Sequence, residues 1–223
     1  MPVAAKLEPR IHIGNGRLKV ERNTSVFINC PFDEEFAPIF ESMLFATACC
    51  GFLPRCAIES GSTSVSRMDR ITTAICSSKY SIHDLSRCRG EGDQNLARFN
   101  MPLELGVAMA QKFDPNGCPD HDWLLLVPRG SQYVRFVSDM AGYDPKQYDV
   151  SPESAIPAVM SWLATRPDAV ITSTPMAVLD ALPDFGNRKR ALSNNWGGEA
   201  PWSDVVLLAI AVGQQYGLIP NAD

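Results

Sequence analysis

The chain alternates between short, almost wholly apolar runs and longer segments with helical spacing, and this alternation limits the folds it can adopt. Residues 25–30 (SVFINC) and 123–128 (WLLLVP) are apolar nearly throughout, as is typical of parallel strands buried on both faces. Residues 34–50 carry apolar side chains at positions 36, 39, 40, 43, 44 and 47, which is the spacing of a helix closed by Gly51. Strands alternating with helices in this way predict a parallel sheet with helices on both faces.

The remaining elements extend the same pattern and then leave it. We expect strands at 55–59 and 80–85, helices at 65–78, 101–112, 132–141 and 152–165, a short strand at 169–171, and a small hairpin around Asn15-Gly16. After Thr172 only helical spacing follows, at 175–192 and 201–218.

These expectations divide the chain into three parts. They are an N-terminal extension (1–24), a flavodoxin-like α/β domain with a parallel sheet of about five strands (25–172), and a C-terminal helical hairpin (173–223). The hairpin is expected to pack on the α/β body or against another subunit.

Composition excludes several classes of protein. A net charge of −5 with scattered basic residues gives no nucleic-acid footprint. No apolar stretch approaches the roughly 18 residues needed to span a bilayer, and residues 1–6 lack the apolar core of a signal peptide. The seven cysteines are an odd number without CxxC spacing, and several lie in apolar runs. We therefore expect a cytoplasmic, reduced protein without a membrane partner.

Residues 98–106 (RFNMPLELG) place one carboxylate at the start of an apolar helix, after a polar loop. Asn100 is a good helix cap, and Pro102 suits the first turn. Glu104 then falls near the third helical position, where the helix dipole favours its ionised form. Glu104 has two interpretations: a capping acid that only starts the helix, or an acid held charged where α/β proteins place their chemistry.

Three polar clusters follow the ends of predicted strands or open the next helix: residues 29–33 (NCPFD), 83–87 (HDLSR) and 100–104 (NMPLE). The carboxyl ends of parallel strands share one crevice, so we expect these segments to converge there. This convergence favours the functional interpretation of Glu104.

The order of these motifs resembles the superfamily of TIR domains and nucleoside 2-deoxyribosyltransferases. It is most similar to bacterial TIR-like proteins that carry an Asn-Met-Pro-(Phe/Leu)-Glu-Leu-Gly signature, often in defence or signalling contexts. The resemblance covers about residues 25–165 and implies cleavage of an N-glycosidic bond to ribose or deoxyribose, with NAD the usual substrate of TIR enzymes. The usual box residues of animal TIR sequences are missing, so the mode of assembly stays open.

The resemblance also assigns roles to individual residues. Glu104 matches the nucleophile of the transferases, which in NADases lies against the ribose, and Asp84 matches the acid expected near the base or the sugar hydroxyls. Both are therefore expected to be catalytic. Asp84 has an alternative as a turn residue that accepts from backbone N–H groups. Pro31 and Phe32 match the segment that lines the substrate cleft. The residues expected to contact substrate are Asn29, Pro31, Phe32, Arg67, Asp69, Arg87, Asn100 and Met101. Of these, Arg67 has an alternative as an ion-pair partner of Asp69 or Glu59, and Arg87 as a solvated loop charge.

The proposed chemistry needs few groups. Breaking the ribosyl–nicotinamide bond of NAD develops an oxocarbenium-like sugar, which an adjacent carboxylate stabilises or captures. Nicotinamide leaves as a neutral molecule, so no strong general acid is required. His83 lies next to Asp84 and near Cys88, but no second His or Cys stands at ligand spacing, so we expect no metal site and no cofactor beyond NAD as substrate.

Three functions remain open at this level. The first is an NAD glycohydrolase or cyclase of TIR type, regulated in an antiviral defence or signalling role by homo-oligomerisation or a partner protein. The second is a nucleoside or nucleotide deoxyribosyltransferase or hydrolase. The third is a non-catalytic nucleotide sensor or adaptor.

Overall fold

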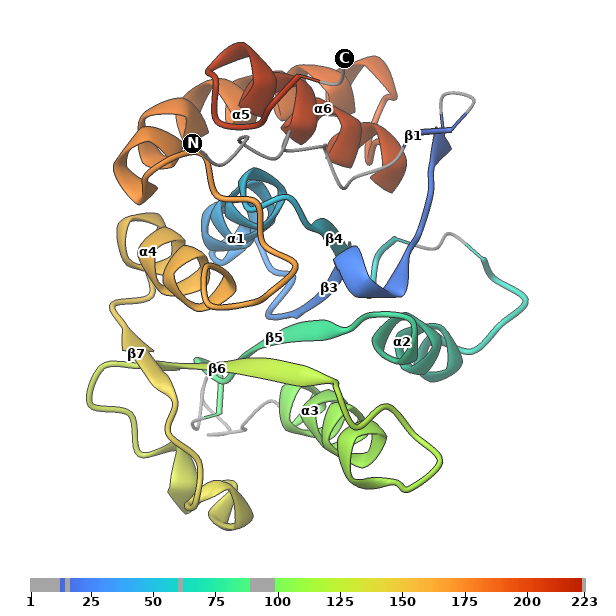
Figure 1. Cartoon of the computed structure of the whole chain (residues 1–223), viewed down its shortest axis with the longest axis vertical. Helices are drawn as coiled ribbons and strands as arrows, with labels where there is room; N and C mark the ends of the chain where they lie inside the picture. Colours follow the sequence, from blue (N-terminus) through green and yellow to red (C-terminus); the bar gives the residue numbers. More distant parts are fainter. Residues whose placement is uncertain (1–12, 15–16, 60–61, 89–98, 222–223) are drawn as a thin grey trace, which may run out of the picture.

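The computed structural model describes residues 13–14, 17–59, 62–88 and 99–221, and its centre is a parallel sheet of five strands (Figure 1). The strands are β3 (Ser25–Asn29), β4 (Leu53–Cys56), β5 (Tyr80–Asp84), β6 (Asp122–Pro128) and β7 (Lys146–Tyr148). They are arranged in the order β4-β3-β5-β6-β7, and every neighbouring pair is parallel. Numbered along the chain this is 2-1-3-4-5, the flavodoxin-like order, and the predicted fold class is confirmed.

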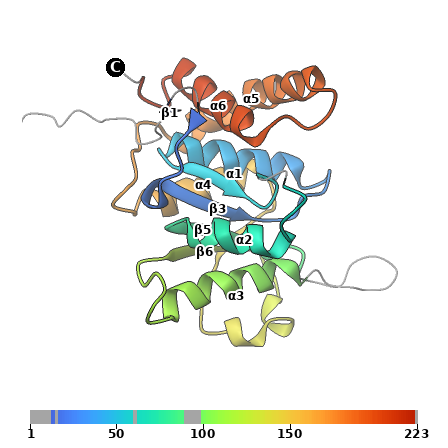
Figure 2. The same ribbon diagram turned by 90° about the vertical axis from the view of Figure 1, so that its right-hand side faces the viewer.

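Helices cover both faces of this sheet. In the described part of the chain they are α1 (Ala37–Cys49), α2 (Arg67–Cys76), α3 (Asn100–Phe113), α4 (Pro152–Leu163), α5 (Pro175–Asn195) and α6 (Trp202–Gln215). Helices α2 and α3 lie on one side, and α1 and α4 on the other (Figures 1 and 2). The helices α5 and α6 form a further layer beyond α1 (Figure 2). None of the helices described is long and apolar enough to cross a membrane.

Helix α1 explains why the C-terminal hairpin packs where it does. Ten of its thirteen residues are buried, so it has no solvent-facing polar side of the kind a surface helix shows. The sheet covers one side of α1 and the hairpin covers another, with the rings of Phe45 and Phe185 stacked 5.0 Å apart and Lys189 Nζ 2.7 Å from Glu41 Oε1. The hairpin thus completes the core of the same chain.

Helix α6 also shields the edge strand β4. Leu53 packs against Val206 and Ile210 of α6, and the indole Nε1 of Trp202 donates to the carbonyl of Pro54 at 3.2 Å. Proline suits an edge strand because it has no N–H to leave unpaired. Strand β4 therefore offers little free backbone to a neighbouring chain.

Two sequence predictions are wrong. Residues 169–171 form no strand; the fifth strand is β7, whose sequence KQY has no apolar run and is recognised only by its pairing with β6. In this segment, Val170 donates its N–H to the carbonyl of Cys50. The expected helix at 132–141 is two 3-10 turns, η2 (Tyr133–Arg135) and η3 (Ser138–Met140).

The N-terminal hairpin is confirmed as far as it is described. Strands β1 (Ile13–Gly14) and β2 (Arg17–Leu18) pair antiparallel, with Ile13 opposite Leu18. The turn residues Asn15 and Gly16 lie outside the described residues.

Candidate functional site

The strand order locates the site before any side chain is considered. From β3 the chain proceeds to β4 on one side and then to β5 on the other, so the topological switch point lies between β3 and β5. Ligands of open α/β sheets bind outside the carboxyl ends of the strands at such a point. Asn29 ends β3, Asp84 ends β5, and Glu104 lies in α3, the next helix described after β5.

Glu104 is a buried acid on α3. Its side chain is 4% exposed, and among the described residues Oε2 has no hydrogen-bond partner. Burial raises the pKa of Glu104 to about 7, and the positive charge of Arg67 partly opposes this shift. A buried polar atom without a partner is rare in native proteins. Asp184 Oδ2 also lacks a hydrogen bond, but Asp184 is ion-paired with Arg188, whereas Glu104 has no ion pair among the described residues.

The local expectations for this helix start need correction. Helix α3 begins at Asn100 itself, Phe99 occupies the cap position, and no side chain caps the helix. Asn100 is exposed, and Glu104 is the fifth helical residue rather than the third. The dipole effect falls off beyond the first turn, so burial outweighs it and the pKa of Glu104 moves up rather than down.

A chain of buried hydrogen bonds supports the start of α3. The amide Nδ2 of Asn29 donates to the carbonyl of Met101 at 2.9 Å and lies 2.9 Å from Nδ1 of His83. The carbonyl of Met101 can only accept, which fixes the amide orientation of Asn29 and makes His83 Nδ1 an acceptor. Both amide hydrogens of Asn29 are therefore used within the protein.

This series of buried hydrogen bonds continues along β5 toward the amino-terminal end of the strand. Nε2 of His83 lies 2.8 Å from Oγ of Ser81, which lies 3.0 Å from Nε2 of His121, and Nδ1 of His121 lies 3.0 Å from the carbonyl of Ser78. Each group donates to the next when both histidines are neutral. Burial lowers the pKa of His83 to about 3, which keeps it neutral at ordinary pH.

Asp84 belongs to the other face of the sheet. Tyr80 and Ile82, which share its strand parity, pack in the core cluster of α1, whereas Ser81 and His83 point to the side of α2 and α3. The carboxylate of Asp84 accepts three hydrogen bonds. The backbone N–H and the hydroxyl of Ser86 donate to Oδ1, and the hydroxyl of Tyr148 donates to Oδ2. Burial raises the pKa of Asp84, and these donors oppose the shift.

A small pocket opens beside Ser86, which donates to this carboxylate. It has a volume of about 280 Å³ and is lined by Ser86, Arg87, Phe36 and Val150 among others. Val150 has a φ of 53°, a strained left-handed conformation for a β-branched residue. Arg87 Nη2 lies 2.6 Å from Glu35 Oε2 and 3.5 Å from Asp33 Oδ1. Arg87 is thus largely buried and ion-paired, not a solvated loop charge.

The remaining expected residues lie just after β3 and at the start of α2. Pro31 is buried, and the half-exposed ring of Phe32 packs edge-on against Phe40 with centroids 5.1 Å apart. Arg67 and Asp69 open α2 and are exposed. Among the described residues no ion pair joins Arg67 to Asp69 or Glu59, and Glu59 is instead bound by Arg55.

The structure therefore joins Asn29, His83 and Met101 directly, and keeps Asp84 in a separate hydrogen-bonded cluster. Sequence reasoning missed four participants: Ser81, His121, Tyr148 and Val150. Only Ser81 had a signal, since it stands two residues from His83 on a strand and so shares its face. In the described ranges, no group of three or more His, Cys, Asp or Glu side chains is arranged to hold a metal ion.

No protein-family model, curated protein or solved structure matches the chain.

Proposed function

We propose that the protein is an N-glycosidase of the TIR and deoxyribosyltransferase kind that cleaves the ribosyl–nicotinamide bond of NAD, with Glu104 as the catalytic carboxylate. The observation that carries this proposal is the buried, unpartnered Oε2 of Glu104 next to the switch point of the sheet. A carboxylate without internal donors keeps its charge available to a cationic group, whereas one bonded on both oxygens does not.

The reaction uses the charge of Glu104 directly. The bond between the ribose carbon and the nicotinamide nitrogen breaks, its electron pair leaves with neutral nicotinamide, and the sugar becomes oxocarbenium-like. Ionised Glu104 stabilises this cation or bonds to it, and water completes hydrolysis with release of a proton. With a pKa of about 7, a substantial fraction of Glu104 is ionised at neutral pH, and a bound cationic pyridinium favours the ionised form further.

The buried hydrogen-bond chain suits a positioning role in this reaction. Asn29 holds the carbonyl of Met101, three residues before Glu104, through a bond inside the protein. Asn29 and Met101 would then fix the start of α3 rather than contact the substrate. Effective carboxylate catalysis depends on such placement within fractions of an ångström.

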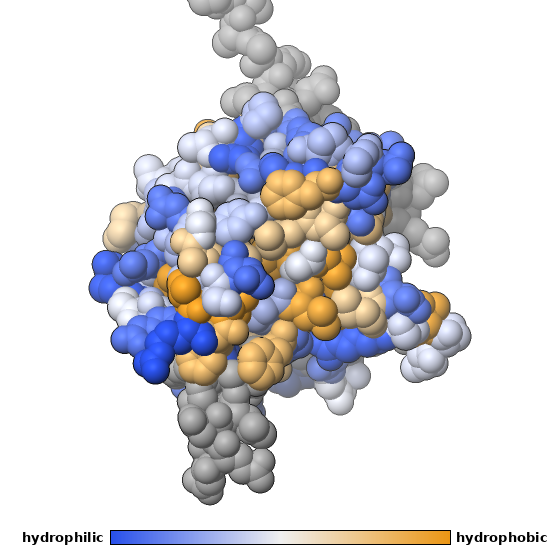
Figure 3. All heavy atoms as spheres, turned by 90° about the horizontal axis from the view of Figure 1, so that it is seen from below, coloured by the Kyte–Doolittle hydropathy of each residue, from blue (hydrophilic) through white to orange (hydrophobic). Residues whose placement is uncertain are grey.

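Control by assembly is part of the same proposal, because uncontrolled cleavage of NAD would be toxic. Viewed from the side of α3, apolar side chains gather on the surface (Figure 3). Phe99, Leu103 and Phe113, at the cap and on α3, are each about 60% exposed. Apolar exposure of this kind on a helix is typical of an interaction surface.

The test is incubation of the purified protein with NAD and, separately, with deoxynucleosides, followed by chromatography for free nicotinamide or free base. We expect nicotinamide from NAD and a loss of turnover of roughly 1,000-fold or more in Glu104→Gln. The matched control is Glu153→Gln, which neutralises an exposed glutamate in the first turn of α4 and should leave turnover unchanged.

The outcomes separate the three functions. Free base from deoxynucleosides, with NAD untouched, would favour the transferase or hydrolase. Saturable binding of NAD without turnover would favour the sensor. Full turnover in Glu104→Gln would overturn the assignment of Glu104.

A further inference from the structure

We propose that a groove between strand β4 and the start of α6 binds a small organic cation with an apolar body. The groove has a volume of about 970 Å³ and lies at the edge strand β4, and Glu104 is not among its lining residues. Its lining consists of Leu18 of β2 and Val20 after it, residues 53–55 of β4 and 58–59 beyond that strand, and parts of 196–207. This proposal does not depend on the N-glycosidase activity.

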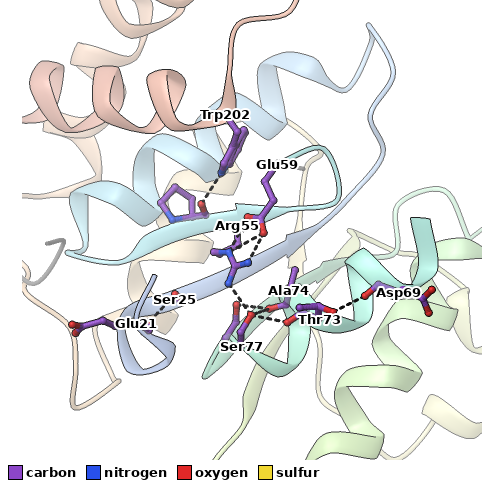
Figure 4. Close-up of polar contacts among 11 residues, drawn as sticks. Glu21, Ser25, Arg55, Glu59, Asp69, Thr73, Ala74, Ser77 and Trp202 are labelled. Carbon is purple, nitrogen blue, oxygen red and sulfur yellow. Dashed lines mark hydrogen bonds and ion pairs between the residues drawn. The ribbon is translucent and has the colours of Figure 1, made fainter. Parts of the chain in front are cut away.

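The walls of the groove are aromatic and aliphatic. Val20, Ile58 and Trp196 are 51%, 45% and 57% exposed, which is high for large apolar side chains that line one concave surface. Trp202, whose Nε1 is tied to the carbonyl of Pro54, forms a fixed second indole (Figure 4). A tryptophan face is the best aromatic partner of an organic cation.

The charges of the groove favour the same ligand. Arg55, the one basic residue of the lining, is only 8% exposed and is held by Glu59 and by Oγ of Ser77 at 2.9 Å (Figure 4). This pairing neutralises Glu59. Glu199 and Asp204 also line the groove, and neither forms an ion pair with any residue that the structure describes. Among the described residues, the one side-chain donor to Asp204 is the neutral hydroxyl of Ser203, at 3.2 Å.

The groove thus presents two uncompensated carboxylates beside two tryptophans. Such a surface attracts cations and disfavours anions.

The backbone of β4 argues for a small molecule over an added peptide strand. Pro54 has no N–H, its carbonyl is taken by Trp202, and the carbonyl of Cys56 accepts from the N–H of Glu59. A peptide laid along this edge would find almost no ladder hydrogen bonds, and those bonds supply much of the affinity in strand addition. A compact ligand needs only the aromatic walls and the carboxylates.

The experiment uses the full chain and two probes that share a benzyl group: benzyltrimethylammonium, a cation, and phenylacetate, an anion. Binding is followed by NMR of the indole N–H signals, assigned with single Trp→Phe variants. We expect saturable shifts of the Trp196 and Trp202 signals with the cation below about 50 mM, and none with the anion over the same range.

Two variants sharpen the test. Glu199→Gln combined with Asp204→Asn should weaken binding of the cation about fivefold, as expected for two partly exposed charges, and Trp196→Ala should weaken it further. The matched control, Glu153→Gln combined with Asp180→Asn, neutralises two exposed carboxylates elsewhere on the surface and should not change binding. The proposal is overturned if the cation does not bind, if phenylacetate binds as tightly, or if the Glu199/Asp204 double variant binds the cation as well as the control.

Discussion

Two buried carboxylates lie near the same edge of the sheet, and they differ in their surroundings rather than in their burial. Asp84 is fully buried and both its oxygens accept hydrogen bonds, from Ser86 and Tyr148. Glu104 is almost as buried, but its Oε2 has no partner in the part of the chain that is described. Desolvation raises the pKa of both.

The comparison shows that burial and a shifted pKa alone do not distinguish a structural acid from a candidate catalytic one. The hydrogen-bond donors around the carboxylate do. Three predictions test this distinction, and a fourth tests the buried histidine next to Asp84.

The largest effect is expected from Asp84→Ala. The substitution leaves the Tyr148 hydroxyl and the Ser86 donors buried without an acceptor, which should lower the free energy of unfolding by about 4 kcal/mol. Urea denaturation followed by circular dichroism measures the change, with Asp180→Ala on the exposed side of α5 as the control. A loss no greater than that of the control would mean that Asp84 is not the structural acid of the pair.

The substitution Glu104→Gln should instead raise the free energy of unfolding. The pKa of Glu104 is about 7 in the folded protein, against an ordinary value of 4.5 in the unfolded chain, so the folded state loses stability as pH rises between these values. Glutamine cannot ionise, so the variant should be more stable than the wild type by up to about 3 kcal/mol near pH 8 and equally stable near pH 4. Unfolding curves at the two pH values decide this, and a variant less stable than the wild type at both would contradict it.

Tyr148→Phe should produce a smaller loss, because Asp84 keeps its Ser86 donors. We expect about 1.5 kcal/mol from the loss of one buried hydrogen bond to a charged group. Tyr216→Phe, at a tyrosine 45% exposed, provides the control in the same denaturation assay. Equal effects of the two substitutions would show that the bond to Asp84 contributes nothing.

His83→Gln should change the pH dependence of stability more than its magnitude. The pKa of His83 falls from 6.5 to about 3 on folding, so the unfolded chain takes up a proton below pH 6.5 that the folded protein does not. Each such group makes stability fall by about 1.4 kcal/mol per pH unit as pH drops from there toward 3. Glutamine keeps one donor and one acceptor in the series of buried hydrogen bonds, so the variant should lose only this part of the dependence of stability on pH. Urea denaturation at several pH values measures it. Identical slopes in the wild type and the variant would show that His83 is not buried in its neutral form.

Much of the fold was predictable because it depends on local patterns. Buried strands such as β3 and β6 appear as apolar runs, and helix spacing locates α1, α5 and α6 to within a few residues. Strand β7 was not predictable, since its three residues are polar enough for a loop and become a strand only by pairing with β6. Edge strands of this kind depend on their neighbours more than on their own composition.

The site was predictable in part, for a similar reason. Strand ends and helix starts are local features, so the sequence brings Asn29, His83 and Glu104 to one edge of the sheet. Strand parity then separates His83 from Asp84, and neither the contact from His121 nor the role of Tyr148 leaves a trace in sequence spacing. Asn100 shows the limit of a local rule, because helix α3 starts one residue earlier than its best capping residue requires.

The sequence by itself determined the order and kind of the main elements, since each depends on side chains within a few residues of one another. It also determined that Glu104 follows the third long strand at a helix start. Only the tertiary structure decided that α1 is covered on both sides, that Asp84 is supplied with donors, and that Glu104 is not. A hydrogen bond between residues such as Asp84 and Tyr148, 64 positions apart, exists only once the sheet has formed, and the chemistry of the site follows from which of these bonds are made.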